Sequence, residues 1–190
     1  MRETFEKAGK GLWLLFIAEI LYLAAFVIAL VPILGWIVGM VMSVIAFLLQ
    51  FYGPYVARHS HPNFMNAFYA SVVSLAVGFL SAFFPEGFMK GLMDIVIALV
   101  GFCITYFICT AAGVLLAEKG DMEQAAQAGL IWKLHAACTV VSILCTLVGW
   151  VPVLDILLGV ASVLSGIVSV VGYVLLIIFY YKASNSLKAA

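Results

Sequence analysis

Long uninterrupted apolar runs constrain the fold of this chain more than any other feature. Several runs extend for about 20 residues without alternating apolar and polar side chains. A transmembrane helix needs about that length, whereas the strands of a membrane barrel alternate over about ten positions. Because unpaired backbone groups cost several kcal/mol each in hydrocarbon, only helices and closed barrels can cross it. The runs therefore predict an all-α polytopic membrane protein.

The low charge content supports this fold class. Only 9% of the 190 residues are charged, and 66% are apolar or aromatic. An ordinary soluble domain has about 25% charged residues, which it needs to cover its surface. The formal net charge is zero, and no basic stripe is present, so no nucleic acid partner is expected.

We predict six transmembrane helices in a single integral membrane domain, 1–190. The expected spans are 11–31, 33–57, 64–84, 88–117, 130–150 and 153–182. They group as three antiparallel hairpins, approximately 11–57, 64–117 and 130–182. Each hairpin turns at a proline: Pro32, Pro85 or Pro152. Proline lacks an N–H and suits the first turn of a helix, so it is expected to begin the second helix of each pair.

The hairpins also show a possible internal repeat. Ala8 and Gly39 match Ala128 and Gly159 at one common shift along the chain. These matches favour a repeated two-helix unit.

Basic residues are distributed asymmetrically between the two expected membrane faces. Those on the side of the termini and the longer connections are Arg2, Lys7, Lys10, Arg58, Lys119, Lys133, Lys182 and Lys188. Lys90 alone is expected on the side of the hairpin turns. Because cytoplasmic loops carry the excess of Lys and Arg, both termini are expected in the cytoplasm. The plasma membrane of a prokaryote is the expected location.

Glu19 and His135 are the candidate intramembrane polar site. Glu19 lies about two turns into the first span, and His135 lies at a similar depth in the fifth. A carboxyl at this depth is costly and is expected to face the bundle interior or a cavity. The two side chains would pair if their helices touch. One interpretation is a proton or cation relay or a substrate-binding carboxyl, and the alternative is a carboxyl bonded to a neighbouring helix.

Three further charged residues lie near the hairpin turns and form a possible outer vestibule. Lys90 and Asp94 have the i, i+4 spacing of a local ion pair. Asp155 falls in the first turn of the sixth span, where negative charge is favoured by the helix dipole. Ordinary structural roles are the simpler interpretation of these residues, and an outer vestibule is the alternative.

Small residues recur at four-residue spacing along several spans, which lets helix backbones approach closely in lipid. Those expected to pack helices are Gly35, Gly39, Ser74, Gly78, Gly101, Thr105, Gly113, Gly159 and Gly166. Packing within the chain is the simpler interpretation, and a contact between copies or a narrow polar pathway is the alternative.

Signatures of catalysis and metal binding are missing. The chain has no P-loop, no nucleophile elbow and no zinc-protease helix motif. Its four cysteines all lie within apolar runs, where cysteine behaves as a small apolar filler. His59 and His61 share one loop without further ligands nearby, so neither a metal nor a cofactor is expected.

The segments AGKGLWLL, VPILGWIVGMVMSVIAFLLQFYGPYV and HPNFMNAFYASVVSLAVG resemble small multi-span proteins of the domain of unknown function 996 type. The likeness covers residues 8–78. The shared features are a glycine near the start of the first span, a glycine after the first turn, a tyrosine near the second helix end and an Asn-Ala pair beginning the third. The resemblance implies a fold and carries no activity.

Three functional hypotheses remain open from sequence. The first is a structural or accessory membrane protein, because few ionisable groups lie within the spans. The second is a small channel, transporter or membrane substrate-binding subunit that uses Glu19, since transporter sites often form between repeated units near the midplane. The third is a membrane-embedded enzyme. Membrane lipids are the expected partners, with a homo-oligomer or other membrane proteins as further possibilities.

Overall fold

The computed structural model describes residues 2–31, 34–85, 87–148 and 155–189, without the side-chain surroundings of residues 34, 148 and 155–165. Within these ranges the regular structure is entirely helical, as the sequence predicted. The helices are α1 (Arg2–Ala29), α2 (Leu34–Ala57), α3 (Pro62–Ser81), α4 (Phe88–Lys119), α5 (Met122–Val148) and α6 (Asp155–Lys188). All six are long and apolar enough to cross a membrane.

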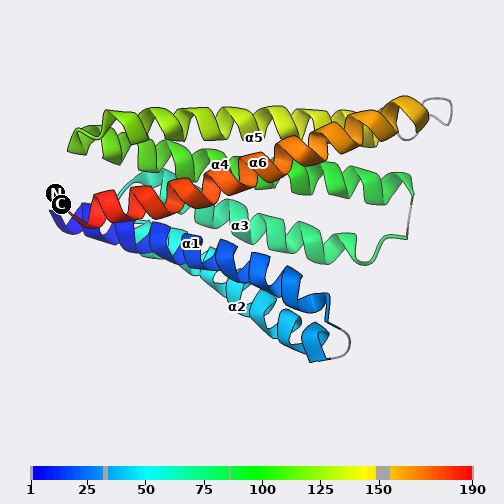
Figure 1. Ribbon diagram of the computed structural model, residues 1–190, viewed down its shortest axis with the longest axis horizontal. Helices are drawn as coiled ribbons and strands as arrows, with labels where there is room; N and C mark the ends of the chain where they lie inside the picture. The colour runs from blue at the N-terminus through cyan, green and yellow to red at the C-terminus, as the bar shows by residue number, and fades with distance from the viewer. Residues whose placement is uncertain (1, 32–33, 86, 149–154, 190) are drawn as a thin grey trace.

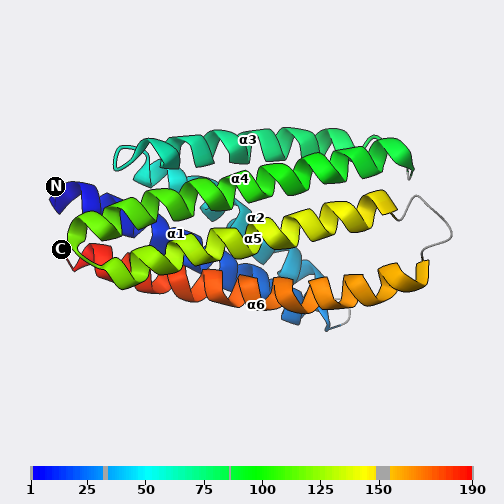
Figure 2. The same ribbon diagram turned by 90° about the horizontal axis from the view of Figure 1, so that it is seen from above.

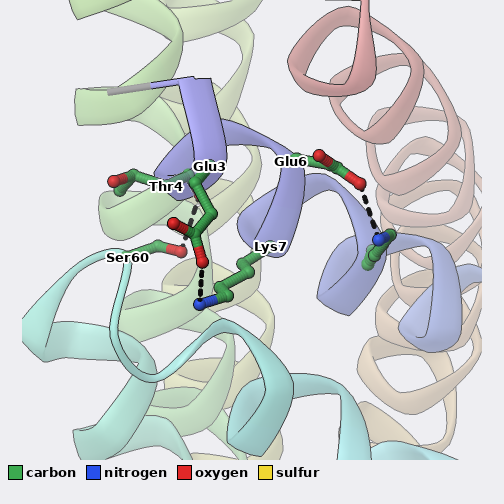
Figure 3. Close-up of polar contacts among 6 residues, drawn as sticks. Glu3, Thr4, Glu6, Lys7 and Ser60 are labelled. Atoms are coloured by element: carbon green, nitrogen blue, oxygen red, sulfur yellow. Dashed lines mark hydrogen bonds and ion pairs between the residues drawn. The ribbon is translucent and has the colours of Figure 1, made fainter.

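Two helices begin earlier than the apolar runs indicated. α1 begins at Arg2, where the side chains of Lys7 and Lys10 form ion pairs with Glu3 and Glu6 at 2.6 Å. Figure 3 shows these pairs lying along one polar helical segment. The i, i+4 pairs support helix formation in a stretch that hydropathy alone assigns to a terminus.

α5 begins at Met122 because the preceding Asp121 caps it. The main-chain N–H of Gln124 donates to Oδ1 of Asp121 at 3.3 Å. A carboxylate before the first turn satisfies one of the free N–H groups at a helix N-terminus. The helix therefore starts before the apolar run predicted from residue 130.

The six helices form an elongated bundle in which each helix contacts the next along the chain. α1 also packs against α6, and this contact closes the sequence of helices into a ring. Figure 1 shows both termini at one end of the bundle, the end that also carries the α2–α3 and α4–α5 connections. Figure 2 shows α3 with α4 on one side and α6 on the opposite side.

Large apolar side chains cover much of the outer surface. Phe26, Leu30 and Phe83 are about 70% exposed at 69%, 72% and 70%. A soluble protein buries side chains of this size, and large exposed apolar surfaces mark protein or membrane contacts. The described exterior therefore resembles that of a chain whose surroundings are apolar.

Glycines bring α1 and α2 into close contact. A Cβ added at Gly11 would lie 2.5 Å from the main-chain oxygen of Gly53, and one at Gly39 would lie 3.0 Å from that of Ala25. A Cβ at Gly35 would collide with the main-chain oxygen of Ile28. Only glycine permits these backbone approaches, which is the role expected of small residues between membrane helices.

Other small residues predicted to pack helices do so unevenly. On α4, a Cβ added at Gly113 would lie 3.3 Å from Cβ of Ala128 on α5. At Gly78, Gly101 and Gly166, by contrast, an added Cβ would meet nothing within 4 Å. These three glycines therefore do not make the close contacts that their spacing suggested. Gly159 lies outside the residues whose surroundings are described.

Packing is concentrated at the end of the bundle that carries the termini. The largest fully buried side chains there include Phe64, Leu116, Phe179 and Leu187. Farther along, burial declines: Ile131 is the last described buried apolar residue of α5. Among the described residues, burial is therefore greater at the terminal end than toward the opposite end.

Candidate functional site

Glu19 lies in the interior of the bundle, on the inward face of α1. Its side chain is buried, with 7% of the residue exposed. The amide of Gln50 on α2 donates from Nε2 to Oε1 of Glu19 at 3.0 Å. The close glycine contacts of α1 with α2 set the register that brings these two long polar side chains together. A buried carboxyl is tolerated only when it has such a partner.

Two further features surround this pair. The hydroxyl of Tyr173 on α6 donates to the main-chain carbonyl of Glu19 at 3.2 Å. Pro54 lies within α2, four residues after Gln50. Proline has no N–H, so it cannot donate to the main-chain carbonyl of Gln50 as an ordinary helical residue would. The site thus combines a carboxyl, a carboxamide and an interrupted helical hydrogen-bond ladder.

Glu19 and Gln50 line a cavity of about 440 Å³ in the middle of the bundle. The described lining residues come from five helices, and none of them belongs to α5. The lining residues are Leu15, Glu19, Phe47, Gln50, Phe51, Ser71, Ser74, Leu75, Gly78, Ile97, Gly101, Ile104, Thr105, Ile108, Leu176 and Tyr180. Ligand pockets commonly have this size and this composition, mostly apolar with a few convergent polar groups.

The small residues of α3 and α4 make room for this cavity. Gly78 and Gly101 have open space where a side chain would stand, and both line the wall. Ser74 and Thr105 lie one helical turn away on the same faces. The stripes that sequence assigned to helix packing therefore widen an internal space at this level.

Hydroxyl groups in the wall are anchored to their own helices. Ser71 donates to the main-chain carbonyl of Ala67 at 2.9 Å, and Thr105 donates to that of Gly101 at 3.3 Å. Each hydrogen atom is thus used within the helix. The oxygen atoms of these two hydroxyls keep their acceptor capacity.

The terminal-end boundary of the cavity is closely packed. Leu15, Ile108 and Tyr180 line the cavity and are 3%, 1% and 2% exposed. They belong to the buried core at the terminal end. Gly78 and Ile97 lie on the wall nearer the opposite ends of α3 and α4. The cavity is therefore closed toward the termini.

The structure does not bring Glu19 and His135 together. His135 is half-buried on α5 and does not line the cavity. A Cβ added at Gly172 of α6 would lie 4.0 Å from its Nδ1 atom. α6 therefore lies between His135 and α1. The residue that meets Glu19 from α6 is Tyr173, beside Gly172.

The structure describes the side-chain surroundings of two of the three residues predicted to form an outer vestibule. Lys90 is half-buried and Asp94 is exposed, both in the first turns of α4, and neither lines the cavity. Asp155 is the first residue of α6, and its side chain lies outside the described residues. Within the described ranges, no group of three or more His, Cys, Asp and Glu residues could hold a metal ion.

Sequence reasoning did not find Gln50, Tyr173 and Tyr180. Gln50 is the sole carboxamide of the second apolar span, and a proline follows it four residues later. That combination was an available signal. The tyrosines carry no comparable signal, because tyrosine is common near membrane helix ends and their places here depend on the contact of α6 with α1.

Comparisons with protein-family models, curated proteins and solved structures found no match. The resemblance to the domain of unknown function 996 type therefore stays a prediction. What the site can do chemically follows from its own groups. One carboxyl, held by an amide inside a mostly apolar cavity, can bind a cation or a hydrogen-bond donor, or exchange a proton.

Proposed function

We propose that this chain is an integral membrane protein that crosses the bilayer six times, as three antiparallel hairpins with both termini in the cytoplasm. Six long apolar helices and an apolar exterior support this topology. So does the excess of Lys and Arg at the end that carries the termini. The same asymmetry orients plasma membrane proteins, and the plasma membrane of a prokaryote is the location we propose.

Within this topology, the protein binds a small solute in the central cavity and moves it across the bilayer. Glu19 carries this proposal. Its buried carboxyl lines a cavity of about 440 Å³ at mid-bundle instead of being packed away between helices. Ionisable residues at such depth are costly and usually mark substrate or ion pathways. A purely structural or accessory role gives no reason for a carboxyl beside open space.

The uneven packing supports transport over a static binding role. Toward the termini the cavity is bounded by buried residues such as Ile108, whereas Leu75 and Gly78 on its α3 wall are exposed. Access from one side at a time is what a transporter requires, and rocking of one group of helices against another could exchange the sides. The Glu19 carboxyl of α1 would remain at the centre of that movement.

Flux in proteoliposomes tests this function. The panel consists of protons, tetraethylammonium, phenethylamine, phenylacetate and glucose, each compared with protein-free vesicles. We expect the wild type to accelerate at least one solute, and Glu19→Gln to reduce that flux by about tenfold or more. Glu118→Gln is the matched control, because Glu118 is exposed near the end of α4.

Two results would count against transport. If no solute of the panel crosses faster than in protein-free vesicles, the structural or accessory hypothesis takes its place. If Glu19→Gln and Glu118→Gln carry the same flux as the wild type, Glu19 has no part in it.

A further inference from the structure

We infer that the cavity selects a monovalent organic cation with a compact apolar body, an inference that rests on the proposed solute-binding function. Among the described residues that line the cavity, Glu19 is the only Asp, Glu, Lys, Arg or His. An anion would meet a carboxylate there with no basic side chain to offset it. A single ammonium matches the single carboxylate, and buried charges require such pairing.

Aromatic rings line the same cavity as the Glu19 carboxyl. Phe47 and Phe51 on α2 have ring centroids 4.8 Å apart, and both line the cavity. Tyr180 contributes a third ring from α6. Ring faces attract a cation within about 6 Å, more strongly when water is excluded. The combination of rings with one carboxyl favours a cation of low hydration.

The remaining wall is mostly aliphatic, which argues against a bare metal ion. Hard cations such as Ca²⁺ take six to eight oxygen ligands. Leucine and isoleucine side chains occupy much of this wall, and the described residues include no cluster suited to a metal. The same side chains favour a ligand whose body is hydrocarbon. A volume of about 440 Å³ holds a ring-sized molecule.

Gln50 adds a second acceptor next to the carboxyl. Its Nε2 is used on Glu19, and no described residue donates to its Oε1. Pro54 also leaves the main-chain carbonyl of Gln50 without its usual helical donor. An ammonium with N–H groups can use such acceptors, so a primary amine suits the site better than a quaternary one.

The test uses three ligands that share one phenyl ring and differ in charge: phenethylamine, 2-phenylethanol and phenylacetate. Binding is measured by titration calorimetry of the full chain in lipid nanodiscs at neutral pH, with empty nanodiscs subtracted. We expect the protonated amine to bind about tenfold or more tightly than the alcohol. Phenylacetate should not bind measurably.

Two variants separate the contributions of charge and ring. Glu19→Gln should lower affinity for the amine to that of the alcohol, while retained alcohol binding shows that the cavity is intact. Phe47→Leu should lower the affinity for the amine by about threefold to thirtyfold and the affinity for the alcohol by less than about twofold. Glu118→Gln is expected to bind all three like the wild type.

The outcomes distinguish this inference from the proposed function. Equal affinity for amine and alcohol, or tighter binding of phenylacetate, overturns the cation assignment and leaves solute binding standing. The same holds if none of the three binds although glucose or protons cross in the flux assay. If no ligand binds and no solute of the panel crosses, both the inference and the proposed function fail.

Discussion

Gln50 donates a hydrogen bond of 3.0 Å to the carboxyl of Glu19, and this bond joins α1 to α2 inside the bundle. The two residues are 31 positions apart in the chain. The bond lies at the edge of a cavity, so each partner is both a structural contact and part of the candidate binding site.

Replacing Gln50 with leucine should destabilise the protein by about 1–3 kcal/mol, because the buried carboxyl of Glu19 loses its donor. Reversible unfolding in mixed detergent micelles, followed by circular dichroism, would measure this loss. The control is Gln127→Leu, since Gln127 makes an exposed bond to Glu123 and should change stability by less than about 0.5 kcal/mol.

A double variant tests whether the stability lost in Gln50→Leu comes from the unpaired carboxyl of Glu19. In Glu19→Leu with Gln50→Leu, neither helix carries an unpaired polar group, so much of the stability lost by Gln50→Leu should return. A double variant that is less stable than either single variant would argue that the pair is not coupled in this way.

Gly11→Ala should destabilise the protein by about 1–3 kcal/mol, because the new methyl group would lie 2.5 Å from the main-chain oxygen of Gly53 and force α1 away from α2. The same unfolding assay checks this. Gly129→Ala on α5 is the matched control, since a Cβ there meets nothing within 4 Å. The free energy of unfolding of that variant should rise by up to about 1 kcal/mol, because alanine has a higher helix propensity than glycine.

The apolar runs predicted the six helices because each run is long enough to determine its own secondary structure. They could not predict the Glu19–Gln50 bond, which depends on the register of α1 against α2. That register follows from glycine contacts such as Gly11 with Gly53. Nor could hydropathy reveal that Gly78 and Gly101 widen a cavity, because a small residue at a close contact and one beside open space have the same spacing.

His135 illustrates a second limit of sequence. Its depth in the fifth span matched that of Glu19, but depth along a helix does not specify which helices are neighbours. In the structure α6 packs against both α1 and α5, so a side chain on α6, Tyr173, takes the place expected for His135.

Lys10→Gln should raise the pKa of the Glu6 carboxyl toward its ordinary value of 4.5. The hydrogen bond from Lys10, and then its positive charge, lower that pKa in the wild type. Because the folded pKa lies below the ordinary one, the pair supports the helix above pH 4.5. That support is lost as the pH falls through the lowered pKa.

Carboxyl carbon shifts of Glu6, recorded by NMR in detergent micelles during an acid titration, would measure the change. Glu3, which pairs with Lys7 at the same spacing (Figure 3), serves as the internal control and should keep its lowered pKa. An unchanged Glu6 titration in Lys10→Gln would contradict the pairing.

The topology predicts opposite labelling at the two ends of the bundle. In a background without the four native cysteines, His59→Cys should react with an impermeant maleimide only after the cytoplasmic face is opened. Pro85→Cys should react in intact cells. His59 and Pro85 are both exposed, so access depends on the side of the membrane. Reaction of both from the same side would refute the hairpin arrangement.

The contact between the first and last helices has a consequence for how the protein is made. Chains emerge from the ribosome with the N-terminal end first, so Glu19 on α1 is synthesised before any of its partners. Gln50 arrives with the next helix, whereas Tyr173 and Ser184, which bond to the main chain of α1, are the last to be synthesised. The Glu19–Gln50 bond can therefore form first between α1 and α2, whereas the cavity wall is completed only when α6 packs against α1. A chain truncated before α6 would lack the part of the cavity wall that Leu176 and Tyr180 supply.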